Sequence, residues 1–200
     1  MPACRNFQKT EIRLILNGFT GRTRERDKAF FLLGVTTGFR VSELCALTIG
    51  DVMTGGKIRN NLTVSRRKTK GKLASRTVPL LDEVRKLLGA RVRELNRNGF
   101  FRPETSLFRM GRSRAYRVLR GCADRQGVTG NIGTHSLRKT FAHNIYQDFL
   151  ERRANGIHLD PLLETSRALG HKTVQNTVAY LPESRALIDS AIRNLVRILQ

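Results

Sequence analysis

Three short segments of the sequence place side chains that can move protons beside side chains that can hold a phosphate. His135 and Arg138 stand three residues apart, so a helix that starts at Thr134 displays both on one face. Near a helix N-terminus, free N–H groups and the helix dipole favour an anion. A histidine that accepts a proton beside an arginine that clamps oxygens suits phosphoryl transfer. Taken alone, the pair also fits a capped helix with a satisfied histidine and a surface arginine.

Two further segments carry polar side chains at similar positions. The tripeptide Leu169–His171 is followed nine residues later by Tyr180, on an expected short helix that stops at Pro182. Arg40 lies at a tight break between two expected helices, and Glu43 is spaced to pair with it. Each segment alone is also typical of ordinary structure, since Tyr180 could pack in the core and Arg40 could form a structural salt bridge.

The elements that must position these residues are mostly helical, because apolar side chains recur at helical spacing along most of the chain. Ser42 and Ser113 are placed to cap two of the helices. The sequence predicts helices capped by Thr10, over Lys28–Thr37, over Glu43–Leu47, around Val84–Leu95, after Ser113, from Thr134 to about Phe149, from Pro161 to Gly170, over about Thr173–Leu181, and over the amphipathic terminal segment Ser184–Gln200.

Two β-like runs, Lys57–Ser65 and Ser75–Leu80, flank the most basic part of the chain. The segment between them, Arg66–Lys72, is expected to form the tip of a hairpin. From Lys57 to Arg76 there are eight basic residues and no acidic one. The predicted fold class is therefore mainly α with a small antiparallel β-sheet.

The composition predicts a folded protein whose partner is a polyanion. The chain has 200 residues and 40% hydrophobic content, which is enough to bury a core. Its 37 Lys and Arg residues against 16 Asp and Glu give a net charge of +21, so nucleic acid is the expected partner. Neither a run of 18 apolar residues nor an apolar signal core is present, which predicts a cytoplasmic protein with no membrane partner. The widely separated Cys4, Cys45 and Cys122 disfavour a disulfide framework and a zinc site.

Together, these segments resemble the tyrosine recombinase, or phage integrase, family from about Phe7 to the end of the chain. The family's first catalytic arginine lies in a Thr-Gly-Leu-Arg-x-x-Glu-Leu setting, which is matched here by Arg40 and its companion Glu43, within Thr37-Gly38-Phe39-Arg40-Val41-Ser42-Glu43-Leu44. Its His-x-Leu-Arg and Leu-Gly-His boxes are matched by residues 135–138 and 169–171, and its nucleophile by Tyr180. The family's lysine lies on a hairpin ahead of an Arg-x-x-Pro-Leu strand, which here is Arg76-Thr77-Val78-Pro79-Leu80.

The resemblance implies a catalytic set and a metal-free mechanism. The implied catalytic residues are Arg40, Lys68, His135, Arg138, His171 and Tyr180. Tyr180 would attack a DNA phosphate and give its proton to His135, while Lys68, with Lys70 as the competing choice, would donate a proton to the departing 5′ oxygen. The arginines and His171 would hold the phosphate oxygens, and Glu43 would orient Arg40. The product is a 3′-phosphotyrosyl link, so no cofactor and no metal are expected.

The implied partner is double-stranded DNA at a specific recombination site. Arg66, Arg67 and Lys70 are expected to touch it, and Arg114 and Arg117 either track the phosphate backbone or form a solvated helix face. A homotetramer is expected on DNA and a monomer when free, because like charges repel. An accessory DNA-bending protein is a further expected partner. The segment Ser184–Gln200 would pack on a neighbouring subunit or on its own domain.

The domain organisation implied is one catalytic domain over residues 1–200, without the family's N-terminal DNA-clamping domain. This layout is similar to the fimbrial phase-variation invertases, and an excised fragment of a longer integrase is the alternative. A type IB topoisomerase, which uses a similar residue set, and a DNA-binding regulator without catalytic activity are the competing functions. The Leu-Gly-His box and its spacing to Tyr180 favour the recombinase. Integration, excision and inversion are not distinguished.

Overall fold

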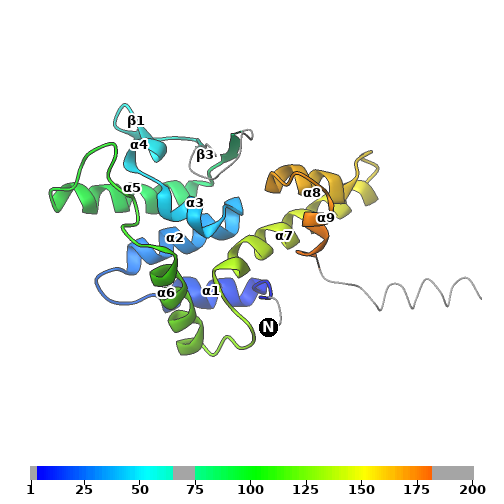
Figure 1. Ribbon diagram of the computed structural model, residues 1–200, viewed down its shortest axis with the longest axis horizontal. Helices are drawn as coiled ribbons and strands as arrows, with labels where there is room; N and C mark the ends of the chain where they lie inside the picture. The colour runs from blue at the N-terminus through cyan, green and yellow to red at the C-terminus, as the bar shows by residue number, and fades with distance from the viewer. Residues whose placement is uncertain (1–3, 65–74, 182–200) are drawn as a thin grey trace, which may run out of the picture.

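The computed structural model describes residues 4–64 and 75–181, which form a mainly helical domain (Figure 1). Its helices are α1 (Lys9–Gly18), α2 (Arg24–Thr37), α3 (Val41–Ala46), α4 (Ile49–Val52), α5 (Asp82–Arg97), α6 (Arg112–Arg125), α7 (Thr134–Ala154), α8 (Pro161–Leu169) and α9 (Gln175–Val178). The predicted fold class, mainly α with small antiparallel sheets, is confirmed. Over these two ranges, no helix combines the length and the apolar character that crossing a membrane would need.

Helix α2 lies at the centre of the fold. Most of its residues from Ala29 to Thr37 are buried, and it packs against both α5 and α7. Figure 1 shows α7 running from the side of α1 and α6 toward α8, which packs along its C-terminal part. Leu137 of α7 fills the space beside Gly34 of α2, where a Cβ would come within 2.8 Å of the leucine side chain. The two helices therefore approach closely at the level of the candidate site.

The strands form two separate two-stranded sheets. β3 (Asn61–Val64) pairs antiparallel with β4 (Arg76–Pro79), in a register that sets Val64 opposite Arg76. β1 (Met53–Thr54) pairs with β2 (Lys57–Ile58). The predicted single run over 57–65 is therefore wrong in part, because its first residues turn back onto the preceding strand and only Asn61 onward joins β4. The predicted hairpin tip, Arg66–Lys72, lies outside the described residues.

The predicted cap Thr10 lies inside the first turn of α1, which follows the extended residue Gln8. Two further predicted helix caps are also wrong by two residues. Helix α3 begins at Val41 rather than after Ser42, because the Glu43 carboxylate accepts a hydrogen bond of 2.6 Å from the Arg40 N–H at the start of the helix. Helix α6 begins directly after the extended residue Gly111, so Ser113 lies inside its first turn. Both differences place a basic residue, Arg40 or Arg112, at the helix start.

Candidate active site

The turn between α2 and α3 places Arg40 beside α7. Helix α2 ends at Gly38, which has a φ of +61°, and a Cβ on Gly38 would clash with the ring of Phe141. Two residues later, the Arg40 guanidinium pairs with the Glu43 carboxylate at 3.2 Å, and the same carboxylate accepts from the Arg40 backbone. The predicted Arg40–Glu43 pairing is present, and it fixes both the backbone and the side chain of a half-buried arginine.

The first turn of α7 carries His135 and Arg138. Arg138 is only 1% exposed, and its guanidinium donates to the carbonyls of Gly38 and Leu169, the latter at 2.8 Å. These two bonds use two of its five N–H donors. Arg138 thereby joins the end of α2 to the end of α8 while keeping donors for another acceptor.

The end of α8 and the short helix α9 position His171. Gly170 ends α8 with a φ of +63°, and the His171 N–H then donates to the Ser166 carbonyl at 3.0 Å. The Nδ1 atom of His171 lies 2.8 Å from the hydroxyl of Thr177, which is fully buried. Thr177 was not singled out from the sequence. Its place three residues before the expected nucleophile is the signal that could have found it.

Tyr180 closes the site from the C-terminal side. It lies just beyond α9, which is shorter than the predicted helix, and its N–H donates to the Thr177 carbonyl at 2.9 Å. The Tyr180 hydroxyl is 2.8 Å from Nε2 of His135. Its ring contacts the imidazoles of His135 and His171, with centroids 5.1 Å and 5.2 Å away. The Arg138 guanidinium lies 5.8 Å from the same ring.

The electrostatics of the site favour the neutral form of His135. The imidazole exposes part of its surface, but partial burial lowers its pKa, and the positive charges of Arg138, Lys139 and Arg40 lower the pKa further. Burial and Arg40 also lower the pKa of Arg138, while Tyr180 and Glu43 act in the opposite direction. An arginine stays protonated throughout the physiological range. The site therefore combines a neutral proton acceptor with a fixed cation.

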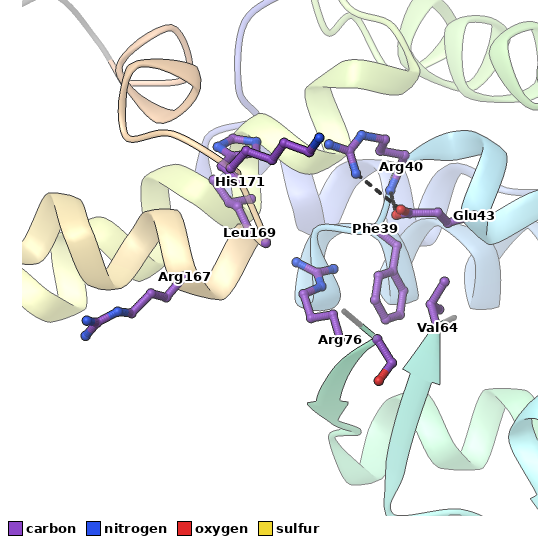
Figure 2. Close-up of a pocket in the computed structure, with 11 residues that line it drawn as sticks. Phe39, Arg40, Glu43, Val64, Arg76, Arg167, Leu169 and His171 are labelled. Atoms are coloured by element: carbon purple, nitrogen blue, oxygen red, sulfur yellow. Dashed lines mark hydrogen bonds and ion pairs between the residues drawn. The ribbon is translucent and has the colours of Figure 1, made fainter. Parts of the chain in front are cut away.

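A cleft of about 230 Å³ opens beside this cluster. Figure 2 shows Arg40, Glu43 and Phe39 on one side of it and His171 on the other, while Arg167 points away. The ends of β3 and β4 complete its wall. An anion that entered this cleft would meet Arg40 and His171, and through His171 the Tyr180 ring.

The structure thus brings together Arg40, His135, Arg138, His171 and Tyr180, which come from four segments of the sequence. Lys68, Lys70, Arg66 and Arg67 lie outside the described residues. The strand ends on either side of them, Val64 and Arg76, both line the cleft. Within the described ranges, no group of three or more His, Cys, Asp or Glu side chains is arranged to hold a metal ion.

The two helical arginines expected to touch DNA are exposed on α6. Arg114 and Arg117 form no ion pair with the described residues, and α6 packs against α3 and α7, the helices that carry Glu43 and Arg138. Arg120, one turn further along, instead pairs with Asp124 at 2.9 Å. Arg114 and Arg117, the two arginines predicted to contact DNA, therefore differ from Arg120 in having no acidic partner among the described residues.

Comparison with known sequences places this site in a family. The model of the phage integrase family matches residues 5–186. A probable integrase/recombinase of Bacillus subtilis, YoeC, is 27% identical over 158 residues, which cover 78% of this chain and 77% of that protein. The tyrosine recombinase XerC of Thermodesulfovibrio yellowstonii is 29% identical over 168 residues and is matched over 50% of its length. The chain therefore spans about half of the XerC relative.

Solved structures share the fold. The XerA recombinase superposes with a TM-score of 0.68 and 25% identity, over 97% of this chain and 66% of that chain. The XerH site-specific recombinase bound to its palindromic difH substrate gives a TM-score of 0.67 at 20% identity, over 94% of this chain and 51% of that chain. The catalytic domain of bacteriophage HP1 integrase gives 0.60 at 23% identity, over 96% of this chain and 95% of that domain. These likenesses confirm the predicted catalytic-domain fold.

Proposed function

This chain belongs to the phage integrase family, and on that basis we propose that it is a site-specific recombinase that breaks and rejoins DNA with Tyr180 as its nucleophile. The observation that carries the proposal is the 2.8 Å contact between the Tyr180 hydroxyl and Nε2 of His135. A phenol has a pKa of about 10 in water, so it needs a proton acceptor in order to attack near neutral pH. The lowered pKa of His135 keeps that acceptor free.

The proposed reaction needs two proton transfers, one from Tyr180 to a base and one from an acid to the departing 5′ oxygen. The Tyr180 oxygen forms a bond to the phosphorus, the bond from phosphorus to the 5′ oxygen breaks, and the phenolic proton passes to His135. A lysine, Lys68 in preference to Lys70, protonates the departing 5′ oxygen. The 3′-phosphotyrosyl link keeps the energy of the phosphodiester, so attack by another 5′ hydroxyl reverses the step and joins a new partner.

Three side chains would stabilise the charge that develops on the phosphate. Arg40 and His171 line the cleft, and Arg138 keeps three N–H donors beyond its two bonds to carbonyls. Donors that are already fixed in place lower the barrier most, since they need not reorganise during the reaction. Glu43, which holds Arg40 in place, would take no direct part.

The proposed substrate is double-stranded DNA bound along the face of α6. Arg114 and Arg117 lie on this helix beside the elements of the site, which supports a role in contacting phosphates. Because recombination joins two duplexes, we propose four copies on the DNA and a monomer when the +21 charge is not neutralised. An accessory DNA-bending protein remains part of this proposal, as does exchange of the segment Ser184–Gln200 between subunits.

Covalent trapping tests the proposal. The protein would be incubated with nicked duplexes tiled from the DNA that flanks its own gene and then run on a denaturing gel. We expect a DNA-linked band that disappears in Tyr180→Phe and persists in Tyr146→Phe, a matched change on α7 outside the site. A band formed on any duplex, with relaxation of plasmids that lack the site, would indicate a topoisomerase instead. Clear binding with no band, both with and without an added DNA-bending protein, would contradict catalysis and indicate a DNA-binding regulator.

A further inference from the structure

Two helices end at the candidate site in the same way. Helix α2 ends at Gly38 and helix α8 at Gly170, and both glycines adopt the left-handed conformation. The last carbonyls of a helix lack partners within the helix and carry partial negative charge. Arg40 comes two residues after Gly38, and His171 directly follows Gly170. Both are among the proposed catalytic residues.

Two arginines lie between the two helix ends. Arg76 donates to the Ala168 carbonyl at 2.5 Å and to the Thr37 carbonyl at 2.7 Å. Arg138 donates to the next carbonyl of each helix, Gly38 and Leu169. Each guanidinium therefore bonds to one carbonyl of α2 and one of α8. The planar fork of arginine suits such a bridge, and the single ammonium group of lysine does not.

Packing fixes the position of Arg76 in addition to these bonds. Its guanidinium carbon lies 4.5 Å from the centre of the Phe39 ring, and its Cδ lies 3.4 Å from the place where a Cβ of Gly170 would stand. Figure 2 shows Arg76 between Phe39 and Leu169, at the wall of the cleft. Phe39 directly precedes Arg40, and Gly170 directly precedes His171. Arg76 thus stacks on the residue before Arg40 and lies close to the residue before His171.

We propose that Arg76 is a positioning residue for strand cleavage, which sets the distance between Arg40 and His171 by bridging the ends of α2 and α8. The inference rests on the proposed function. Helix α8 is also held by its packing along α7. The loss of Arg76 should therefore change the distance between Arg40 and His171 across the cleft while α8 stays packed in the fold. A small displacement of groups that contact a reacting phosphate lowers the rate far more than it lowers affinity.

The test compares Arg76→Ala with a matched control, Arg91→Ala. Arg91 is another buried arginine, 6% exposed, which donates to the Leu107 carbonyl and pairs with Glu94 on α5. Single-turnover rates of the covalent adduct and the Kd for DNA would be measured with and without millimolar guanidinium ion. Potassium chloride at equal ionic strength controls for screening.

We expect Arg76→Ala to slow adduct formation by about 10- to 100-fold while the Kd for DNA changes by less than about twofold. Guanidinium ion should restore part of the rate in Arg76→Ala and none in Arg91→Ala. Arg76→Lys should stay slow, because it keeps the charge but not the fork. An unchanged rate in Arg76→Ala, a loss confined to Kd, or equal responses of the two alanine variants to guanidinium would overturn the proposal.

A second readout separates this inference from the proposed function. If the wild-type protein forms no adduct, strand cleavage is refuted, and amide exchange then decides whether the bridge exists. The N–H groups of Gly38 and His171 donate to the carbonyls of Gly34 and Ser166. We expect these two amides to exchange faster in Arg76→Ala and not in Arg91→Ala. Guanidinium ion should restore their protection. Unchanged exchange at both amides would overturn the bridge whatever the activity.

Discussion

The hydroxyl of Tyr180 lies 2.8 Å from Nε2 of His135, although the two residues are 45 positions apart in the sequence. They meet because α7 presents His135 in its first turn and because the Thr177 carbonyl holds the backbone of Tyr180. The proposed nucleophile and its proposed proton acceptor are therefore already within hydrogen-bond distance in this structure. The proposed phosphate would enter through the neighbouring cleft, which Arg40 and His171 line.

The first prediction concerns pH. Partial burial and three nearby cations lower the pKa of His135, so the imidazole stays neutral below its ordinary pKa of 6.5. We expect the acid limb of the rate of adduct formation, measured in single turnovers at DNA concentrations well below saturation so that it reports the free protein, to lie below pH 6.5. A limb at or above 6.5, or one that persists in His135→Asn, would contradict this role.

The same shift affects stability, with a definite sign. Above pH 6.5 His135 is neutral in both the folded and the unfolded chain, so it contributes no pH dependence. As the pH falls below 6.5, His135 takes up a proton in the unfolded chain but stays neutral in the folded protein. The free energy of unfolding therefore decreases until the pH reaches the lower pKa of the folded protein. Urea unfolding across this range should show a smaller decrease in His135→Asn than in the wild type.

The second prediction distinguishes the two lysines. Whichever lysine protonates the departing 5′ oxygen becomes dispensable when that oxygen is replaced by sulfur, because a thiolate leaves without a proton. We expect Lys68→Ala to cleave ordinary DNA slowly and a 5′-bridging phosphorothiolate at nearly the wild-type rate. Lys70→Ala should respond equally to both substrates, and the reverse pattern would assign the role to Lys70.

Much of the site follows from the sequence because its motifs are local. Arg40 with Glu43, and His135 with Arg138, stand at helical spacings, and such spacings fix relative positions within one turn. The bridge through Arg76 could not be predicted in this way. Its acceptors are backbone carbonyls, which every residue carries, so no residue type marks them.

The boundaries of elements were less predictable for a related reason. Helix α3 begins two residues before its expected start at Glu43, because the Glu43 carboxylate accepts a hydrogen bond from the Arg40 N–H. The run from Lys57 was expected to be one strand, but the chain turns at Gly55 and Gly56, and Lys57 pairs with Thr54. In both cases a local alternative competes with the hydrophobic pattern, and that pattern alone does not decide between them.

The third prediction concerns the DNA-binding face. Arg114 and Arg117 are exposed and form no ion pair within the described part of the chain, so each is available to neutralise one phosphate. We expect each alanine substitution to reduce the slope of log K against log salt by about 1, with little dependence on DNA sequence. Arg120→Ala, which removes an arginine already paired with Asp124, is the matched control. An equal effect of all three substitutions would refute the assignment.

The last prediction concerns Thr177, whose buried hydroxyl lies 2.8 Å from Nδ1 of His171. This contact fixes the ring, so that Nε2 is presented in one orientation to the cleft. Removing a residue that orients another residue of an active site lowers activity by about 10- to 100-fold. Here Thr177 would orient His171. We expect Thr177→Val to slow adduct formation within that range and Thr177→Ser, which keeps the hydroxyl, to retain most of the rate.

A matched control separates this effect from the cost of losing any buried hydroxyl. Thr165 on α8 is equally buried, and its hydroxyl donates to the Pro161 carbonyl at 2.7 Å without contact to the imidazole. Thr165→Val should lower the thermal midpoint as much as Thr177→Val does, yet leave the rate of adduct formation of the folded protein close to wild type. If Thr177→Ser is as slow as Thr177→Val, or if Thr165→Val is equally slow, then Thr177 supports the fold rather than the orientation of His171.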